Sequence, residues 1–197
     1  ELDIAILFTI GGDGTLRGAR ALVQEIKKRD CAISVIGIPK TIDNDISYVS
    51  RTFGFETAVE VSRAVIQSAH VESKGAENGV GLVKLMGRDS GFIAAQAAIA
   101  NADVNFCLTP EAPFSLEGEK GLLSKLETRL RRRHHAVIVV AEGAGQELMT
   151  GDVRCDASGN KLHEDIGIFL KDSIVAHFKS RGIPVTVKYI DPSYIIR

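Results

Sequence analysis

Short apolar runs alternate with longer amphipathic stretches along the whole of this chain of 197 residues. Such alternation is typical of βαβ units wound into a mainly parallel sheet, and it predicts an α/β fold. The runs short enough to be single strands are residues 4–10, 33–37, 79–85, 106–108, 136–141 and 185–189. Helices are expected between them, with apolar residues three or four positions apart, at residues 16–28, 56–73, 90–100, 117–131 and 162–179.

Two connections show little periodicity of either kind. Residues 39–55 form the first candidate loop, and loops of that length inside a compact domain are usually functional. We therefore expect this loop to carry chemistry. Residues 142–160 form a second connection, which is polar and holds four glycines.

The composition limits the class of partner. Hydrophobic residues make up 45% of the chain, enough for one medium domain or two lobes with a shared core. The 24 Lys and Arg balance 25 Asp and Glu, so the formal net charge is -1 and no general attraction to nucleic acid or an anionic membrane is expected. The apolar runs are far shorter than the roughly 20 residues of a membrane-spanning helix. We expect small-molecule partners.

The cysteines and the chain ends add two expectations. Cys31, Cys107 and Cys155 stand far apart and form neither a metal-binding pair nor an even set for disulfides, which favours a reducing compartment. The chain starts at Glu1, runs directly into a strand-like segment and stops at Arg197. We expect it to be a piece of a longer protein.

The first candidate motif is GGDGT, residues 11–15, between a predicted strand and a predicted helix. Ligands bind at the carboxyl ends of parallel strands, where glycines and a helix N-terminus favour a phosphate. Asp13 is a suitable Mg2+ ligand. The alternative is a plain turn with Asp13 or Thr15 as the helix cap, since the motif matches neither G-x-G-x-x-G nor the P-loop pattern.

The second motif is GIPKTIDNDI, residues 37–46, at the end of the next predicted strand. Asp43 and Asp45 can divide the work of accepting a proton from an alcohol and orienting it, and Lys40 would keep such a base ionised. The alternative is an Asx-rich turn after Pro39. The functional interpretation gains support because two loops that bear carboxylates follow consecutive strands and could therefore open on one edge of the sheet.

The third motif is KLMGRDSG, residues 84–91, where a predicted strand enters a helix. Arg88 offers the planar set of donors that matches a phosphoryl group in transfer. The alternative is a surface arginine paired with an acid such as Asp89.

Taken together and in this order, GGDGT, PKTIDNDI, RTFGFETAVE and VKLMGRDSGF resemble the phosphofructokinase family over essentially the whole chain. The later segments LTPEAPF, IVVAEGAGQ, DASGNKL and VKYIDPSYIIR are similar to the branch found in plants and trypanosomatids. The resemblance implies two Rossmann-like lobes with mainly parallel sheets: residues 1–52 in a nucleotide-binding lobe, 53–184 in a sugar-phosphate-binding lobe, and 185–197 returning toward the first. It also implies a homo-oligomer, tetrameric in relatives.

The resemblance implies that ATP donates its terminal phosphate to the 1-hydroxyl of fructose 6-phosphate in glycolysis. Asp13 would hold Mg2+ beside the nucleotide, in a pocket that includes Gly12, Gly14, Thr15, Gly18 and Lys40. Asp43 would be the catalytic base, with Thr41 beside the transferring phosphate and Asp45 supporting the site.

The remaining implied roles concern the sugar phosphate. Arg88 would stabilise the transition state, while Met86 and Gly87 lie against the sugar and Glu142 hydrogen-bonds its hydroxyls. The 6-phosphate would be bound by Lys188, Tyr194 and Arg197.

The chain departs from bacterial members at several positions. Gly79 stands where they carry an arginine that reaches a neighbouring subunit, and Glu111 matches an effector-site carboxylate but is assigned no role here. Gly14 favours ATP, because pyrophosphate-dependent relatives have a blocking aspartate there, whereas Lys40 is typical of pyrophosphate enzymes. ATP enzymes of the plant and trypanosomatid branch combine both features, so we expect ATP, with pyrophosphate second.

Two other classes of function stay open at this point. One is a non-catalytic module that binds a sugar phosphate or nucleotide, and the other is a lipid or NAD kinase, which shares GGDGT but would lack TIDND and MGR. The expected location is the cytoplasm, with the glycosome or plastid as alternatives.

Overall fold

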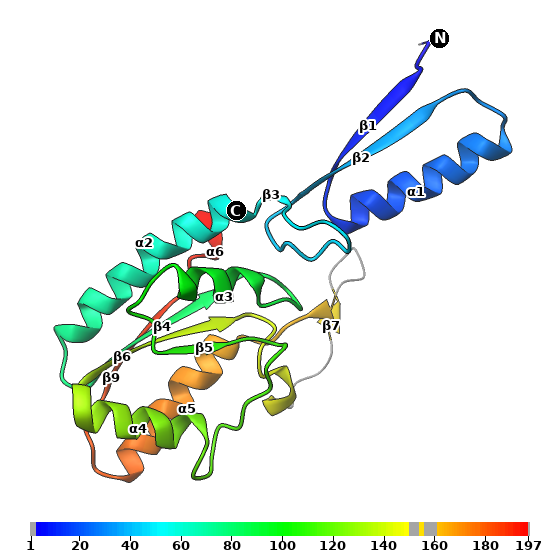
Figure 1. Cartoon of the computed structure of the whole chain (residues 1–197). Helices are drawn as coiled ribbons and strands as arrows, with labels where there is room; N and C mark the ends of the chain where they lie inside the picture. Colours follow the sequence, from blue (N-terminus) through cyan, green and yellow to red (C-terminus); the bar gives the residue numbers. More distant parts are fainter. Residues whose placement is uncertain (1–2, 150–153, 156–160, 197) are drawn as a thin grey trace. The chain divides into compact units, whose positions relative to one another are not determined.

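The computed structural model describes residues 3–149, 154–155 and 161–196 (Figure 1). Contacts between residues divide the chain into two compact units, Glu1–Glu56 and Thr57–Arg197. All strand pairs in the two larger sheets are parallel, which confirms the predicted α/β class.

The first unit is a small βαβ arrangement. Strand β1 (Ile6–Gly11) pairs with β2 (Ser34–Thr41), helix α1 (Asp13–Lys28) connects them, and the short β3 (Phe53–Gly54) extends the sheet beyond β2. A Cβ added at Gly37 would lie 2.8 Å from Leu16 Cδ2, so the glycine lets α1 pack close to β2.

Burial within this first unit is slight. Helix α1 has no buried residue, although its apolar side chains share one face. On β1, the side chains of Ile6, Phe8 and Ile10 are 54%, 57% and 62% exposed. The unit therefore lacks a core of its own.

The second unit is built on a four-stranded parallel sheet in the order β5-β6-β4-β9. Its helices are α2 (Phe55–Lys74), α3 (Phe92–Ile99), α4 (Leu122–Arg133), α5 (Ile166–Ser180) and the short α6 (Ser193–Ile196). The strands are β4 (Gly79–Leu85), β5 (Phe106–Leu108), β6 (His135–Ala141) and β9 (Thr186–Ile190). A single turn, η1 (Gln146–Leu148), and a small antiparallel pair, β7 (Arg154–Cys155) with β8 (Lys161–Leu162), lie between β6 and α5.

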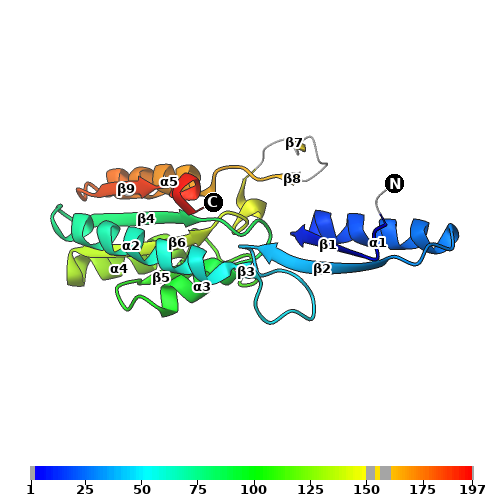
Figure 2. The same ribbon diagram turned by 90° about the horizontal axis from the view of Figure 1, so that it is seen from above.

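Helices cover both faces of this sheet (Figures 1 and 2). Helices α2 and α3 lie on one face, and α4 and α5 lie together on the other. Gly81 on β4 lets α2 approach, since an added Cβ would lie 2.8 Å from the Ala69 carbonyl oxygen. Fully buried side chains such as Leu82, Ile138 and Leu170 fill the layers between.

The predicted elements are found in the predicted order, and β4 and β5 have the predicted bounds. Several ends were wrong. Helix α1 begins at Asp13 rather than residue 16, so Asp13, Gly14 and Thr15 form its first turn. Strand β2 continues to Thr41, so the long connection begins after that residue.

The starts of three further helices were wrong in the opposite direction: they were predicted too early, because turns and caps precede these helices. Helix α3 begins after the turn that closes at Gly91, α4 begins after Gly121, and α5 begins after its cap Asp165. The Asp165 carboxylate accepts hydrogen bonds from the backbone N–H groups of Gly167 and Ile168, at 2.9 and 3.2 Å.

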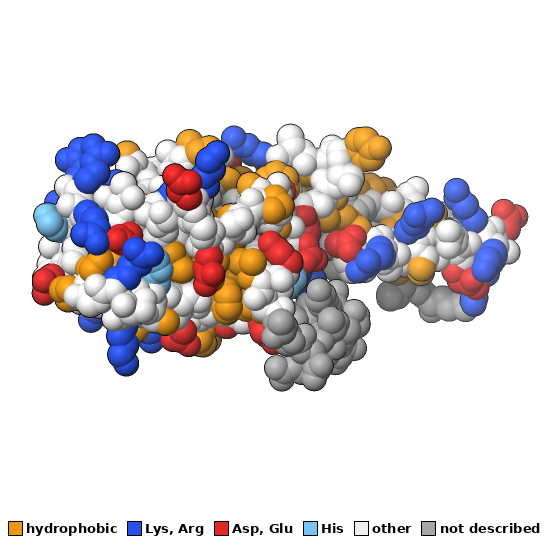
Figure 3. Space-filling view, turned by 90° about the horizontal axis from the view of Figure 1, so that it is seen from below, with side chains coloured by type: hydrophobic (Ala, Val, Ile, Leu, Met, Phe, Trp, Pro, Cys, Tyr) orange, Lys and Arg blue, Asp and Glu red, His pale blue; other side chains and the backbone are white. Residues whose placement is uncertain are grey.

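The surface shows mixed charge. Basic and acidic side chains are interspersed over the face drawn in Figure 3. Within the described ranges, none of the helices combines the length and apolar character that crossing a membrane requires.

Candidate active site

The GGDGT segment lies at the carboxyl end of β1, where it turns into α1. Gly12 is the N-cap residue, and no side chain caps the first turn, so backbone N–H groups at this end have no side-chain acceptor. Apart from neighbouring residues and the backbone of α1 itself, no atom lies within 4 Å of a Cβ added at Gly14 or Gly18. The helix N-terminus therefore presents an open, glycine-lined surface, which suits an anion.

Asp13 stands in the first turn of α1, with 57% of its side chain exposed. Its carboxylate pairs with Arg17 across one turn of the helix, at 2.9 Å. No group of three or more His, Cys, Asp or Glu that would suit a metal occurs in the described part of the chain. A single exposed carboxylate fits Mg2+ that takes its other ligands from phosphates and water.

The end of β2 lies close to this turn. A Cβ added at Gly12 would be 3.5 Å from Thr41 Cβ, so GGDGT and PKTIDND meet at one edge of the small sheet. Thr15 and Lys40, both predicted for the same pocket, are exposed. The first unit thus brings together the two predicted loops that it contains.

The loop after β2 is held by Asn44 and Thr52. The Asn44 side-chain oxygen accepts hydrogen bonds from the Thr52 backbone N–H at 2.8 Å and from its hydroxyl at 3.3 Å. Asn44 has a left-handed backbone, with φ of 54°, as expected of an Asx-rich turn. The turn interpretation therefore holds for Asn44.

The carboxylates on either side of Asn44 differ in exposure. Asp43 is half-buried, and its backbone N–H donates to Thr41 Oγ1 at 3.3 Å. Asp45 is exposed. The Thr41 hydroxyl therefore lies beside the backbone of Asp43.

In the second unit, the loop after β4 carries Arg88. Arg88 has a left-handed backbone with φ of 50°, and Gly87 before it has φ of 141°. Such conformations are uncommon for residues other than glycine and occur often at functional sites. The Arg88 side chain is exposed, whereas Gly87 is buried and Met86 half-buried.

Glu142 holds this loop in place. Its Oε1 accepts hydrogen bonds from the backbone N–H groups of Arg88 at 2.6 Å and Gly87 at 3.3 Å. A side chain at the next residue, Gly143, would overlap the Arg88 carbonyl oxygen. Two predicted site segments are therefore in direct contact, and in this structure Glu142 supports the backbone around Arg88.

Of the residues predicted for the 6-phosphate, Lys188 and Tyr194 lie in the described part of the chain, and no hydrogen bond or ion pair joins these two. Lys188 lies within β9 and pairs with Glu72 of α2 at 3.3 Å. Tyr194, on α6, is 95% exposed. Arg197 lies outside the described residues. Asp13 and Asp43 belong to the first unit and Arg88 to the second, so their convergence on one phosphate stays a prediction.

A partly buried ionic cluster beside this loop was not predicted. Lys84, near the end of β4, has only 13% of its side chain exposed, and its Nζ lies 2.9 Å from both Asp165 Oδ2 and Asp191 Oδ2. Tyr189 Oη donates to Asp165 at 2.8 Å. A lysine inside an otherwise apolar strand was the one sequence signal, because such a charge needs a partner.

The cluster shifts the titration of its members. Burial acts to lower the pKa of Lys84, but hydrogen bonds to Asp191 and Asp165 outweigh it and raise the pKa above the ordinary lysine value. Burial acts to raise the pKa of Asp165 and of Asp191. Hydrogen bonds, chiefly from Lys84 to Asp165 and from Ser193 and Lys84 to Asp191, lower both pKa values instead. All three groups are therefore charged near neutral pH.

The residues before Asp165 make further contacts to the same region. His163 Nε2 lies 3.0 Å from the carboxylate of Asp89. The Gln146 side chain donates to the carbonyl oxygens of Glu142 and Glu164, at 2.9 and 3.1 Å. Residues 163–165 thus connect the Arg88 loop, the Glu142 loop and the end of β4.

Glu111 supports the start of the next helix. Its carboxylate accepts a hydrogen bond from the Gly91 backbone N–H at 2.7 Å, where α3 begins. Burial acts to raise the pKa of Glu111, but this and other hydrogen bonds outweigh it and lower the pKa. The interpretation as a structural loop acid fits these contacts.

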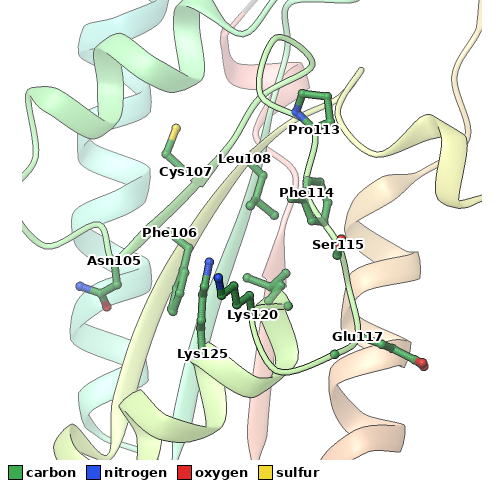
Figure 4. Close-up of a pocket in the computed structure, with 13 residues that line it drawn as sticks. Asn105, Phe106, Cys107, Leu108, Pro113, Phe114, Ser115, Glu117, Lys120 and Lys125 are labelled. Atoms are coloured by element: carbon green, nitrogen blue, oxygen red, sulfur yellow. The ribbon is translucent and has the colours of Figure 1, made fainter.

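A cleft of the second unit lies elsewhere, beside β5 (Figure 4). It measures about 660 Å³, with Phe106, Leu108 and Phe114 in its wall and Lys120 and Lys125 reaching into it. None of the predicted site residues lines it.

With the fold and these loops in view, comparison with known proteins defines the class. The profile described as Phosphofructokinase matches residues 1–190. The chain belongs to the phosphofructokinase family.

Curated relatives with high identity carry one description. The chain is 55% identical to ATP-dependent 6-phosphofructokinase of Trypanosoma brucei brucei, over 100% of this chain and 40% of that protein. It is 53% identical to the protein of the same description from Borreliella burgdorferi, over 100% of this chain and 46% of the relative. It is also 53% identical to ATP-dependent 6-phosphofructokinase 7 of Arabidopsis thaliana, over 97% of this chain and 40% of the relative.

Solved structures support the fold. The pyrophosphate-dependent phosphofructokinase of Marinobacter aquaeolei aligns with a TM-score of 0.71 at 22% identity, over 99% of this chain and 46% of that one. Phosphofructokinase of Saccharomyces cerevisiae aligns with a TM-score of 0.69 at 24% identity, over 98% and 26%. The chain spans less than half the length of the relatives it matches.

Proposed function

We propose that the complete protein is an ATP-dependent 6-phosphofructokinase, which transfers the terminal phosphate of ATP to the 1-hydroxyl of fructose 6-phosphate. The observation that carries this proposal is that a chain 53–55% identical to relatives of that description has Asp13, Asp43 and Arg88 in the three motifs. The non-catalytic alternative fits less well, because it gives no reason for the presence of all three.

In the proposed reaction, the oxygen of the 1-hydroxyl attacks the terminal phosphorus of ATP while Asp43 accepts the hydroxyl proton. The bond from that phosphorus to the bridging oxygen breaks, and ADP leaves with the bridging oxygen. Arg88 offsets charge that spreads over the transferring group, and Thr41 hydrogen-bonds it. Asp13 would hold Mg2+, which neutralises phosphate charge when bound. The enzyme's contribution is mainly positioning and electrostatics.

The local geometry supports these roles within each unit. Gly12 and Thr41 lie at one sheet edge, so the nucleotide and acceptor loops are neighbours. Glu142 fixes the left-handed backbone at Arg88 by accepting two N–H groups. We propose that Glu142 binds sugar hydroxyls with its remaining acceptor capacity, Met86 and Gly87 contact the sugar, and Lys188, Tyr194 and Arg197 bind the 6-phosphate.

The choice of ATP depends on Gly14 and Lys40. The space around Gly14 is open, which leaves room for an α-phosphate that an aspartate there would repel. Lys40 is the residue of pyrophosphate-dependent relatives, so pyrophosphate is the second candidate donor. The curated relatives above combine high identity with an ATP-dependent description.

A kinetic comparison on the complete protein tests the proposal. Purified protein is given fructose 6-phosphate with either MgATP or magnesium pyrophosphate, and fructose 1,6-bisphosphate is measured by a coupled assay. We expect kcat/KM to be at least about 100-fold higher with ATP. Preference for pyrophosphate would reverse the choice of donor, and diacylglycerol or NAD as the better acceptor would overturn the class.

The assembly, location and domain division are also proposals. We propose a homo-oligomer, a tetramer as expected for the family, in the cytoplasm. A plastid or glycosome is the alternative, and one relative, 50% identical over 97% of this chain, is described as chloroplastic. The division into 1–52, 53–184 and 185–197 stays a prediction, while β9 and α6 pack in the second unit here.

A further inference from the structure

The partly buried cluster around Lys84 joins two segments that the proposed function uses separately. Lys84 stands three positions before Gly87, in the strand that leads to Arg88. Asp191 follows β9 directly and stands three positions before Tyr194. Backbone pairing of β4 with β9 ends at Val83 and Ile190, and the Lys84–Asp191 ion pair occupies the next position.

Each carboxylate in the cluster also caps a helix. Asp191 accepts from the Ser193 backbone N–H at 3.0 Å and from the Ser193 hydroxyl, at the start of α6, which bears Tyr194. Asp165 caps α5 while it binds Lys84. One ammonium group therefore joins the ends of two strands to the beginnings of two helices.

Tyr189 fixes the side of the cluster that faces α5. Its hydroxyl donates to both oxygens of Asp165, at 2.8 and 3.0 Å. Its ring lies against Gly167 in the first turn of α5, where any side chain would overlap it. The packing leaves Asp165 little freedom to turn away from Lys84.

Stability alone does not account for such an arrangement. A half-buried ion pair must repay the cost of removing its charges from water, so an apolar residue at position 84 would often serve the sheet as well. A charge that gathers two carboxylates from distant parts of the chain instead fixes where those parts lie.

We propose that Lys84, with Asp165 and Asp191, is a positioning residue for the sugar-phosphate site. It holds the Met86–Arg88 loop and the segment containing Tyr194 in one fixed relation, so that a sugar phosphate is held at both ends. This inference rests on the proposed function. Lys84 would thus support the site without contacting either substrate.

The test compares Lys84→Met with Lys171→Met in the complete protein. Methionine keeps the length of the side chain without its charge, and Lys171 is an exposed lysine of α5. For Lys84→Met, we expect kcat/KM for fructose 6-phosphate to fall roughly 10- to 100-fold, through KM and kcat together. KM for ATP should stay within about twofold, because the nucleotide loops belong to the other unit. Lys171→Met should match the wild type.

A second arm asks whether the cluster acts as one unit. Asp191→Asn keeps an oxygen to accept from Ser193 but removes the charge that faces Lys84. We expect the double variant with Lys84→Met to lose little more than Lys84→Met alone, since the same interaction is already absent. Losses that multiply, or an equal loss for both substrates in proportion to a lowered melting temperature, would overturn the positioning role.

Hydrogen exchange gives a readout that does not depend on activity. In Lys84→Met, amides of Arg88 and Ser193 should exchange faster, while those of Val137–Val140 in β6 keep wild-type rates. If the wild-type protein does not phosphorylate fructose 6-phosphate, the proposed function fails. The exchange rates then decide whether the cluster holds the Met86–Arg88 loop and the segment containing Tyr194. Exchange rates unchanged in Lys84→Met would overturn the positioning role.

Discussion

At the scale of single residues, the candidate site depends on backbone conformations that few residue types tolerate. Asn44 and Arg88 both have left-handed backbones. The Asn44 side chain accepts a hydrogen bond from the Thr52 backbone, and the Arg88 backbone N–H donates to the Glu142 side chain. Asn44 is the residue type expected at such a position. Arg88 is not, and Glu142 provides the compensating hydrogen bonds.

Asp43→Asn tests the proposed base. Asparagine keeps the size of the side chain but accepts no proton, so turnover should fall by about 100- to 10,000-fold while fructose 6-phosphate still binds. Steady-state kinetics and a direct binding measurement on the complete protein give both values. Asp45→Asn, at the exposed neighbour, is the matched control and should lose far less. Near-normal turnover in Asp43→Asn would remove it from the mechanism.

Glu142 should matter for folding as well as for catalysis. Glu142→Ala leaves the N–H groups of Gly87 and Arg88 without their acceptor, which should lower the free energy of unfolding by about 1–3 kcal/mol. Glu142→Gln keeps an acceptor oxygen and should lose less. Urea unfolding followed by circular dichroism measures both. Equal losses would mean that hydrogen bonding to the loop is not what Glu142 contributes.

At the scale of secondary-structure elements, the sequence predicted what apolar runs determine and missed what side-chain contacts determine. Strand β4 has the predicted bounds because its residues form a mostly apolar run that stops at Leu85, just before Met86-Gly87. Helix α1 begins three residues before the predicted start, because glycines such as Gly12 and Gly14 are typical of turns and led to the prediction of a turn there. Lys84 and Asp165 are 81 positions apart, and no local pattern joins them.

The Lys84 cluster should make stability depend on pH. The pKa values of Asp165 and Asp191 are lowered in the folded chain. Their contribution is therefore complete above the ordinary carboxyl pKa of about 4 and is lost as pH falls through the lowered values. The raised pKa of Lys84 means that its own contribution is complete below the ordinary lysine pKa and is lost only at higher pH.

Lys84→Met reveals this dependence. The difference in free energy of unfolding between wild type and variant should be constant from about pH 6 to pH 9 and should shrink below about pH 4. This difference shrinks in acid because protonated, uncharged Asp165 and Asp191 no longer form ion pairs with the ammonium group of Lys84. Urea unfolding at a series of pH values measures the difference, with Lys171→Met as control. A difference that stays constant down to pH 2 would contradict the assigned ionic contacts.

At the scale of the whole molecule, the apolar core is distributed unequally between the two units. Apart from Phe55, every buried apolar residue in the described ranges lies in the second unit. The first unit instead exposes much of Ile6, Phe8 and Ile10, although it carries Asp13 and Asp43. Its hydrogen-bonded sheet was predictable from strand patterns, whereas this lack of burial was not, because burial depends on what packs against the sheet.

The 197-residue chain should therefore open its first unit well before its second. Few buried contacts mean a low free energy of local opening, so amides of β1 and β2 should exchange at least about 100-fold faster than those of β4 and β6. Hydrogen exchange followed by mass spectrometry resolves the four strands.

Relatives are more than twice as long as the part that this chain matches, so the complete protein is the informative comparison. There, packing against Ile6, Phe8 and Ile10 would slow exchange in β1 toward that of β4. Equal protection of all four strands in the 197-residue chain would show that the first unit is stable without such packing, and that the exposed side chains of β1 do not limit its stability.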